Sequence, residues 1–564
     1  MKKIQTILNT NLKVIMTSNE ETLNSIIPYW FPTAKYQSFW FDGSCDSHIK
    51  NNYSQLLALE EAGNFDNLTD SQQLLARIIL LDQFTRNIYR GTATAYKNDS
   101  KALQLALNVL DNSFHTYPFH TYPLHQYIFI LMPLRHTKQS SYLDRVRAHI
   151  STIQPKTPEE KQILTKFTKA TLASYSPLED TIETFRFDIP TNPYQSIQLV
   201  HSYSFTYNNT YNSILDAKCS TWEEYGTGSQ KEVNTTPLYK TIQKYFKNKN
   251  ISSVAVSLSG GVDSMVILDI CRHLRDLGDL KQVWAIHMEY VNREEDSPLE
   301  THFLKDFCQN FQIPIVVRKI NYMRRDEVDR EFYEEETRKA RFATYKYMQR
   351  EHQVQTFCLG HHYGDLGENV LMNVFKGRDI LDLFVMSETA VQETVNLSRP
   401  LLQNPKSDIY EYAEKNQIPY FNDTTPDWSC RGTIRRRIMP LLEEQWGECI
   451  HKTLAEVGKK SAEWDSVIET MVIRPFLNTV KQTTNSISFE VTEQLLEQPK
   501  VFWQRVLMEL FHSKGSKMIS NKNLTTMLEM LKKRYNSRDA LKISLSNGWS
   551  GEFKKNALTI YLTT

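Results

Sequence analysis

A short apolar run, VAVSL (254–258), leads directly into SGGVDS (259–264), and this junction limits what the chain can fold into. A run of this length is typical of a buried strand. Gly260 and Gly261 carry no Cβ, so the backbone there can turn sharply and approach an anion closely. The junction therefore predicts a strand, a tight turn and a helix that begins beside a ligand.

The sequence after this junction repeats the same alternation. The strand candidates VWAIHM, IPIVVRKI and VQTFCLG (354–360) alternate with helical segments near residues 264–277, 297–311 and 334–351. Such alternation builds a parallel sheet with helices on both faces, and ligands bind at the carboxyl ends of its strands. We therefore expect an α/β doubly wound domain over residues 236–445.

The residues after the first strand are those that a phosphate site needs. The following helix presents free backbone N–H groups and the positive end of its dipole. Ser259 and Ser264 add hydroxyl donors, and Asp263 has the oxygen chemistry to hold a magnesium ion that bridges phosphates. Neither the lysine of a Walker loop nor a G-x-G-x-x-G pattern occurs here. A glycine-rich turn without a ligand is the less favoured alternative, because the full S-x-S-G-G-x-D-S pattern lies between a strand and a helix.

This stretch closely resembles the pyrophosphate loop of the N-type ATP pyrophosphatases. The resemblance implies a domain that cleaves ATP to AMP and pyrophosphate and adenylates a carbonyl oxygen, which turns that oxygen into a leaving group. It also implies magnesium at Asp263 and ATP contacts from Ser257, Ser259, Gly260, Gly261, Val262, Asp263 and Ser264.

A second segment, LGHHYGDLGENVLMNVFKG (359–377), resembles a G-H-H-x-D-D-x-x-E-T stretch of the tRNA(Ile)-lysidine synthetases and their relatives, the tRNA 2-thiocytidine synthetases. The resemblance implies catalytic roles for His362, Asp365 and Glu368 and an ATP contact for His361. Asp365 and Glu368 are at i and i+3, so their carboxylates lie on one helix face. A solvated helix face and structural histidines are the alternatives.

Upstream, YEEETRKARFATY (333–345) places Arg338 and Arg341 at i and i+3 of a helix. It resembles the A-R-x-x-R-Y helix of the same family. The resemblance implies that both guanidinium groups contact ATP phosphates or the RNA backbone, and a solvated basic face is the alternative.

The densest basic run of the chain lies in residues 418–442, a segment that resembles the lysidine synthetase template D-x-S-N followed by R-N-x-x-R-x-x-x-x-P-x-L. The net charge of the whole chain is only +1, so RNA contacts would have to come from such a local cluster. A basic run is more often a solvated face, and the motif context favours RNA here. The resemblance implies tRNA contacts from Arg431, Arg435, Arg436 and Arg437.

Four positions depart from these templates. Gly364 replaces an aspartate, Asn369 a threonine, and Pro426 and Gly432 replace asparagines. The Gly364 departure puts a complete metal or amino-acid site in doubt. Together the four keep open a tRNA-binding adaptor with a degenerate ATP site.

Seven cysteines are scattered without a C-x-x-C pair, which predicts free thiols in a reducing compartment. The 2-thiocytidine branch carries cysteine pairs for an iron–sulfur cluster, so their absence favours lysine over sulfur as the nucleophile. No apolar run approaches 18 residues and the N-terminus shows no clear signal-peptide core, so we expect a cytoplasmic protein without a membrane span.

The rest of the chain predicts two further domains. Apolar residues recur at helical spacing over residues 20–215, which predicts an all-helical domain, and its segments 75–103 and 122–139 resemble tetratricopeptide-like domains of unknown function. A protein partner is one role left open for it. After a linker-like stretch and the central domain, residues 446–564 combine helices with two closing strands and resemble the substrate-binding region of lysidine synthetases. In the first domain, a pocket or a buried ion-pair scaffold would account for Asp82, Arg86, Asn87 and Arg90.

Together these resemblances imply a ligase that modifies tRNA with ATP and magnesium. In this hypothesis, O2 of an anticodon cytidine of tRNA(Ile) with a CAU anticodon attacks the α-phosphate of ATP, and free lysine then displaces AMP. The anticodon base must flip out to reach the loop. The alternatives are another base modification, such as thiolation from an external sulfur donor, and the adaptor.

Overall fold

The chain forms two compact units in the computed structural model: Met1–His361 with Glu388–Asp423, and His362–Ser387 with Thr424–Thr564. Most of the predicted linker at 219–237, and Pro426, lie outside the described residues. The structure describes residues 19–112, 122–187, 211, 214–216, 236–291, 296–384, 386–421, 423, 429–447, 449–516, 518–537, 539–545 and 548–562.

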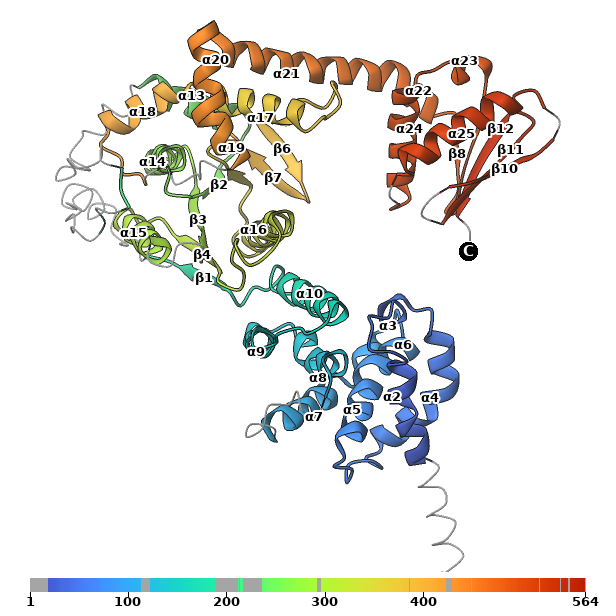
Figure 1. Ribbon diagram of the computed structural model, residues 1–564. Coiled ribbons are helices and arrows are strands. Elements are labelled where there is room, and N and C mark those ends of the chain that lie inside the picture. Colours follow the sequence, from blue (N-terminus) through green and yellow to red (C-terminus); the bar gives the residue numbers. More distant parts are fainter. Residues whose placement is uncertain are drawn as a thin grey trace, which may run out of the picture. The chain divides into compact units, whose positions relative to one another are not determined.

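The first unit begins with the helices that Figure 1 draws in blue to teal. Their buried side chains form a core of their own. Trp30 is fully buried and meets the rings of Phe84 and Phe129 edge to face, at centroid distances of 5.3 and 5.9 Å. The predicted helical character of this region is confirmed, while its tetratricopeptide-like character stays a prediction. The helices are α2 (Ile26–Trp30), α3 (Phe39–Asp42), α4 (Asp46–Glu61), α5 (Ser71–Ile79), the π-helix η1 (Leu80–Phe84), α6 (Thr85–Ile88), the 3-10 helix η2 (Ala93–Tyr96), α7 (Asp99–Asn112), α8 (Leu124–His136), α9 (Ser140–Ser151) and α10 (Pro158–Ala173).

The polar cluster on η1 and α6 forms ion pairs. Asp82 is buried and accepts a hydrogen bond from His136 Nδ1 at 2.7 Å. Arg86 pairs with Asp99 at 2.6 Å, and Arg90 pairs with Asp46 at 2.5 Å. These contacts agree with the ion-pair scaffold rather than with a pocket lined by the cluster.

A seven-stranded sheet follows, in the order β1-β4-β3-β2-β5-β7-β6. Its inner pairs are parallel and its outer pairs, β1 with β4 and β6 with β7, are antiparallel. The expected doubly wound, parallel-rich sheet is therefore confirmed. Its strands are β1 (Ile182–Phe185), β2 (Ser253–Ser257), β3 (Gln282–Tyr290), β4 (Ile315–Ile320), β5 (Thr356–Cys358), β6 (Thr389–Gln392) and β7 (Val395–Ser398), and its helices in this unit are α13 (Pro237–Asn248), α14 (Val262–Asp276), α15 (Asp296–Asn310), α16 (Arg330–His352) and α18 (Lys406–Lys415).

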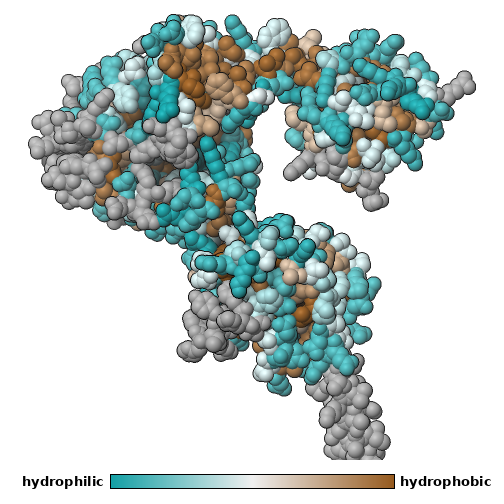
Figure 2. All heavy atoms as spheres, in the orientation of Figure 1, coloured by the Kyte–Doolittle hydropathy of each residue, from teal (hydrophilic) through white to brown (hydrophobic). Residues whose placement is uncertain are grey.

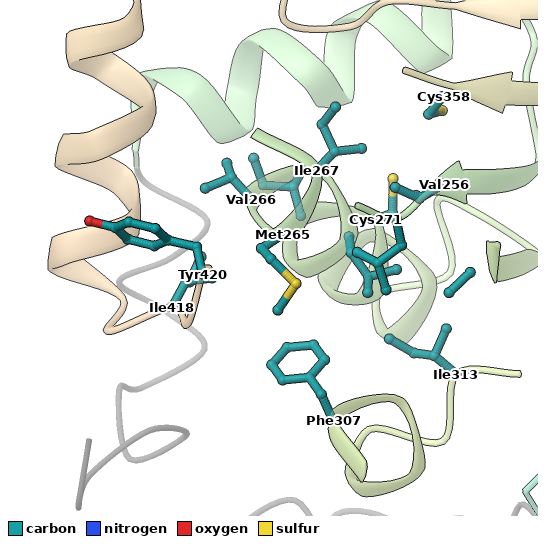
Figure 3. Close-up of a cluster of buried hydrophobic side chains, with 14 of the residues drawn as sticks. Val256, Met265, Val266, Ile267, Cys271, Phe307, Ile313, Cys358, Ile418 and Tyr420 are labelled. Carbon is teal, nitrogen blue, oxygen red and sulfur yellow. The ribbon is translucent and has the colours of Figure 1, made fainter. Parts of the chain in front are cut away.

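Strand β2 bears a different core on each face. Val254 and Val256 pack with α13, α14, α15 and α18, whereas Ala255 packs on the side of α16. Figure 3 shows Val256 and Cys358, from neighbouring strands, close to Cys271 of α14. Strands buried on both faces read as continuous apolar runs, which is why VAVSL identified β2 from the sequence.

Strand β1 lies inside the region that was expected to be wholly helical. It pairs with β4, and Arg318 of β4 is fully buried beside it. The Nη2 group of Arg318 donates to the carbonyl oxygens of Tyr175 and Ser176 at 2.9 and 3.2 Å. Pairing with β4 therefore determines that these four residues form a strand, because a sequence pattern of four residues is too short to predict one.

The second unit combines helices with a five-stranded antiparallel sheet of order β10-β11-β12-β9-β8. Figure 2 shows apolar surface over α20 and α21, where Leu441, Trp446 and Trp464 are each at least 60% exposed. None of the described helices is long and apolar enough to cross a membrane. The elements are α17 (Tyr363–Phe375), α19 (Cys430–Thr433), the π-helix η7 (Ile434–Ile438), α20 (Met439–Trp446), α21 (Cys449–Ile468), the π-helix η8 (Glu469–Ile473), α22 (Arg474–Leu477), β8 (Lys481–Gln482), β9 (Ser486–Glu490), α23 (Glu493–Leu496), α24 (Lys500–Ser513), α25 (Asn521–Arg534), β10 (Leu541–Ser544), β11 (Trp549–Lys554) and β12 (Ala557–Leu562).

Candidate functional site

The strand order creates a switch point beside β2. The chain runs from β2 outward to β3 and β4, and then returns to β5 on the other side of β2. The loops after β2 and β5 therefore leave the sheet next to each other, which is where doubly wound sheets bind ligands. Gly360, after β5, confirms the closeness: a Cβ there would lie 3.0 Å from Cβ of Asp263 and 3.3 Å from the backbone nitrogen of Ser264.

The loop after β2 depends on a glycine at position 260. Gly260 has a φ of +81°, in the left-handed region. A Cβ there would lie 2.0 Å from Cε2 of Phe421, whose backbone N–H donates to the Gly260 carbonyl at 2.8 Å. Phe421 therefore fixes the turn from a distant part of the chain.

Hydroxyl groups brace the same loop. The backbone N–H of Ser259 donates to Oγ of Ser264 at 3.2 Å, and Oγ of Ser264 donates to the carbonyl of Gly261 at 2.9 Å. The hydroxyl of Tyr345, on α16, donates to Oγ of Ser257 at 2.8 Å. Helix α14 begins at Val262, and its N-cap residue Gly261 has no side chain to cap it. The N–H of Gly261 itself donates to Oγ of Ser259 at 3.3 Å. The loop thus places uncapped N–H groups and hydroxyls at the positive end of a helix, as an anion site requires.

Asp263 has a partner that the sequence analysis missed. Nζ of Lys406 lies 2.6 and 2.7 Å from the two carboxylate oxygens of Asp263. Lys406 is the first residue of α18 and is 143 positions away in the sequence. A basic residue at the start of a helix is a weak signal, since cations are favoured at the opposite end. The contact between Lys406 and Asp263 can therefore be recognised only from the folded structure.

His287 also contacts the loop after β2, and the sequence did not predict this contact. Its Nδ1 donates to the carbonyl of Leu258 at 2.9 Å, from a buried position on β3. Burial lowers the pKa of His287 to about 4, so the imidazole is neutral at pH 7. An apolar strand with one histidine gives no hint of this contact from the sequence.

The predicted ATP contacts outside the loop divide into two groups. Nη2 of Arg341 donates at 3.2 Å to the hydroxyl of Tyr290, which ends β3, and the phenol raises the pKa of Arg341 despite burial. Arg338, by contrast, is exposed and donates to Oε1 of Gln392 on β6 at 3.1 Å. After β5, Nδ1 of His361 accepts a hydrogen bond from Arg399 at 3.3 Å. Arg341 and His361 therefore lie at the carboxyl edge of the sheet, and Arg338 lies one helical turn away.

In the second unit, His362 caps α17. Its Nδ1 accepts from the N–H of Gly364 at 3.1 Å, and its own N–H donates to Oδ2 of Asp365 at 2.9 Å. A Cβ at Gly364 would lie 2.9 Å from Cε1 of His362. The departure at Gly364 therefore leaves room for the capping imidazole.

The two predicted catalytic carboxylates are paired with two of the predicted tRNA-binding arginines. Asp365 and Glu368 are buried, at 2% and 5% exposure. Nε of Arg435 lies 2.8 Å from Oε1 of Glu368 and its Nη2 lies 3.1 Å from Oδ1 of Asp365. Arg431 reaches both carboxylates as well. The carboxylates thus form a buried ion-pair cluster, which fits a positioning role better than a solvated helix face.

The remaining arginines of the basic run, Arg436 and Arg437, are exposed. All three consecutive arginines lie on η7, where a π turn changes which side chains share a helix face. The sequence alone could not separate the inward-facing Arg435 from its two neighbours.

Asp263 supplies the one carboxylate that the sequence predicts for a magnesium ion. Its carboxylate already pairs with the ammonium group of Lys406, and Mg²⁺ is usually held by one or two carboxylates together with substrate phosphates and water. No cluster of three or more His, Cys, Asp or Glu side chains with metal-site geometry occurs among the described residues. A metal at Asp263 would therefore need the phosphates of a nucleotide to complete its ligands.

Comparisons with known proteins agree with this geometry. Residues 234–442 match the family model of the PP-loop domain, and residues 26–187 match that of a bacterial protein of unknown function, DUF924. The tRNA(Ile)-lysidine synthase of Chlamydia caviae is 27% identical over 298 residues, 52% of this chain and 90% of that protein. The protein of the same name from Bacillus licheniformis is 26% identical over 273 residues, 47% of this chain and 56% of that protein.

Among solved structures, the U34-tRNA thiolase NcsA from Methanococcus maripaludis superposes with a TM-score of 0.33 and 17% sequence identity, over 40% of this chain and 78% of that chain. This likeness is too small to support an argument. The PP-loop match confirms the pyrophosphate-loop resemblance.

Proposed function

We propose that this chain is an ATP-dependent ligase that modifies a tRNA cytidine as tRNA(Ile)-lysidine synthases do. The observation that carries the proposal is the loop after β2, which joins a left-handed Gly260, an uncapped helix N-terminus and Asp263 at the switch point of the sheet. The Chlamydia caviae relative, matched over 90% of its length, supports the choice of substrate.

The first half-reaction belongs to this loop. The phosphates of ATP bind the N–H groups at the start of α14 and the hydroxyls of Ser259 and Ser264. Oxygen O2 of the cytidine attacks the α-phosphorus, the bond from that phosphorus to the bridging oxygen breaks, and pyrophosphate leaves. Arg341 adds positive charge at the same edge, where charge on the transferred group is best stabilised by fixed cations.

Lys406 has a defined part in this step. In the structure its ammonium group neutralises Asp263. Magnesium would bind at Asp263 and neutralise charge on the pyrophosphate. With magnesium held at Asp263, Lys406 would pair with phosphate oxygens, so that neither the carboxylate nor the ammonium group would be left without a partner.

In the second half-reaction the ε-amine of free lysine attacks C2 of the adenylated base, the bond between C2 and O2 breaks, and AMP leaves with O2. One amine proton is lost. Asp365 and Glu368 hold Arg431 and Arg435 in a fixed arrangement, which would position these cations for RNA, while the exposed Arg436 and Arg437 contact the tRNA backbone.

The test is AMP formation from ATP by the purified full chain, with and without unmodified tRNA(Ile) and lysine. We expect AMP release that depends on tRNA and is lost in Asp263→Ala. Wild-type protein that binds this tRNA and releases no AMP would contradict the proposal and favour the adaptor. AMP release that depends on tRNA and is indifferent to lysine would favour another base modification.

A further inference from the structure

The N-terminal helices contain a cavity of about 310 Å³ that the proposed ligase reaction does not use. Its walls come from α3, α8, α10 and the segment before α3. Most of the lining is apolar, and the side chains that define it are Tyr36, Trp40, Phe41, Arg135, Lys166 and Phe167.

The aromatic walls have flat surfaces at fixed angles. Trp40 is almost fully buried and meets Phe129 edge to face at 5.0 Å, so its ring cannot turn to fill the space. Tyr36 and Phe41 stack at a centroid distance of 6.2 Å, and Phe41 is 46% exposed. The cavity therefore offers ring faces and edges to a flat guest and has an opening near Phe41.

Arg135 supplies a cation that forms no salt bridge with the described residues, although the buried Asp82 acts on it electrostatically from beyond ion-pair distance. Its guanidinium lies 4.8 Å from the centre of the Phe167 ring, and Nη2 contacts only the thioether sulfur of Met132, a weak acceptor. No carboxylate of the described residues lies within ion-pair distance of Arg135, whereas the buried Arg77 of the same domain pairs with Glu60 at 2.9 Å. Burial lowers the pKa of Arg135 to about 10, so it stays charged at pH 7.

Lys166 adds a second cation at the same cavity. Its ammonium group stands 3.5 Å from the centre of the Tyr36 ring and forms no ion pair with the described residues. The two charges come from different helices, α8 and α10, and both border the aromatic walls. A ligand with an anionic group between the two cations and an aromatic ring against the aromatic side chains would form ion pairs and ring contacts at the same time.

We propose that this cavity is a binding site for a small aromatic carboxylate. The guanidinium of Arg135 forms a forked contact with the carboxylate, Lys166 adds charge, and the ring packs among Tyr36, Trp40 and Phe167. The volume is at the lower end of ligand pockets, about 300–1,000 Å³, so it suits a guest with one or two fused rings. The helical domain would then sense or hold a metabolite of this class.

The test uses isothermal titration calorimetry on the full chain, with indole-3-propionate and 4-phenylbutyrate as probes and their primary amides as uncharged controls. We expect saturable binding of at least one carboxylate and at least about tenfold weaker binding of its amide, since the ion pair is lost. Arg135→Gln should weaken the carboxylate at least about tenfold, and Lys166→Ala to a smaller extent. Lys161→Ala, an exposed lysine on the same helix, should leave binding unchanged.

Three results would each overturn the proposal: no saturable binding of either carboxylate, equal affinity for acid and amide, or unaltered affinity in a folded Arg135→Gln protein. If thermal melting shows that Arg135→Gln does not fold, the comparison of acid with amide and the exposed Lys166→Ala variant still decide. If Lys166→Ala binds the carboxylate with unchanged affinity and the amide binds as tightly as the acid, the cavity does not recognise the carboxylate charge and the proposal is wrong.

Discussion

The substitution Gly260→Ala places a methyl group where the structure has no room for one. The residue has a φ of +81°, and the new Cβ would lie 2.0 Å from Cε2 and 2.1 Å from Cδ2 of Phe421. An L-residue in the left-handed region costs about 1–2 kcal/mol, and overpacking costs about 1–3 kcal/mol more. We therefore expect the free energy of unfolding of this domain to fall by about 2–5 kcal/mol.

Phe421 is not free to move aside without cost. Its backbone bonds to Gly260 at 2.8 Å, its ring meets Phe303 at 5.5 Å, and it bridges to Leu215. The strain will therefore act on the loop and displace the N–H groups and hydroxyls that we propose bind the phosphates of ATP. Loss of ATP–pyrophosphate exchange should accompany the loss of stability.

Gly278→Ala is the matched control. Gly278 has a φ of +83°, and a Cβ there would meet nothing within 4 Å. Its substitution therefore carries only the backbone cost, about 1–2 kcal/mol, and should leave exchange intact. The double variant Gly260→Ala/Phe421→Ala removes the clash and should recover part of the exchange activity, which a purely conformational effect would not allow.

Thermal melting of the full chain and ATP–pyrophosphate exchange measure the two effects. We expect Gly260→Ala to melt below Gly278→Ala by about 2–4 °C for each kcal/mol of difference, with exchange reduced at least about tenfold. Equal melting temperatures and equal exchange rates for the two variants would refute the reasoning about Phe421.

Three further predictions follow from the same contacts. Lys406→Ala should raise the KM for ATP at least about tenfold in the exchange assay. Lys415→Ala, which replaces an exposed lysine on the same helix, should leave the KM unchanged. Equal KM values for the two variants would show that Lys406 does not bind the phosphates of ATP. Arg435→Gln removes one cationic partner from the buried carboxylates of Asp365 and Glu368, so it should lower the free energy of unfolding, measured in urea, by about 1–3 kcal/mol. The control Arg437→Gln, at an exposed arginine, should lower it by less than about 0.5 kcal/mol. Similar values for the two variants would show that the ion-pair cluster contributes nothing to stability. The pKa of His287 is about 4 in the folded protein, against an ordinary value of 6.5, so between these pH values the unfolded state binds a proton that the folded state does not. The free energy of unfolding should therefore fall by up to about 3 kcal/mol from pH 7 to pH 4. His287→Asn should flatten that part of the stability profile, and an unchanged profile would contradict the assignment.

Local patterns were enough to predict the sheet and the loop. The run VAVSL is buried on both faces and became β2, and the two glycines and Asp263 lie at its carboxyl end as expected. The spacing of Asp365 and Glu368 correctly placed both on one helix face, α17. Each of these inferences depends on residues within a few positions of one another, where backbone geometry decides the outcome.

Long-range pairing was beyond the sequence. Phe421 meets Gly260 and Lys406 meets Asp263 from well over a hundred positions away, and neither residue type is unusual at its place. Strand β1 exists because β4 offers it a partner. The side chain of Arg435 points inward because the π turn changes which residues share a helix face, and nothing in the run RRR predicts a π turn.

The most direct test of the central claim is mass spectrometry of nucleosides from unmodified tRNA(Ile) with a CAU anticodon, after incubation with the full chain, ATP, magnesium and lysine. We predict that one cytidine gains the mass of a lysine residue and that Asp263→Ala, with its fold confirmed by thermal melting, produces no gain. A wild-type reaction that consumes ATP and leaves this cytidine unchanged would contradict the lysidine reaction, and a gain that persists in Asp263→Ala would contradict the role of the loop.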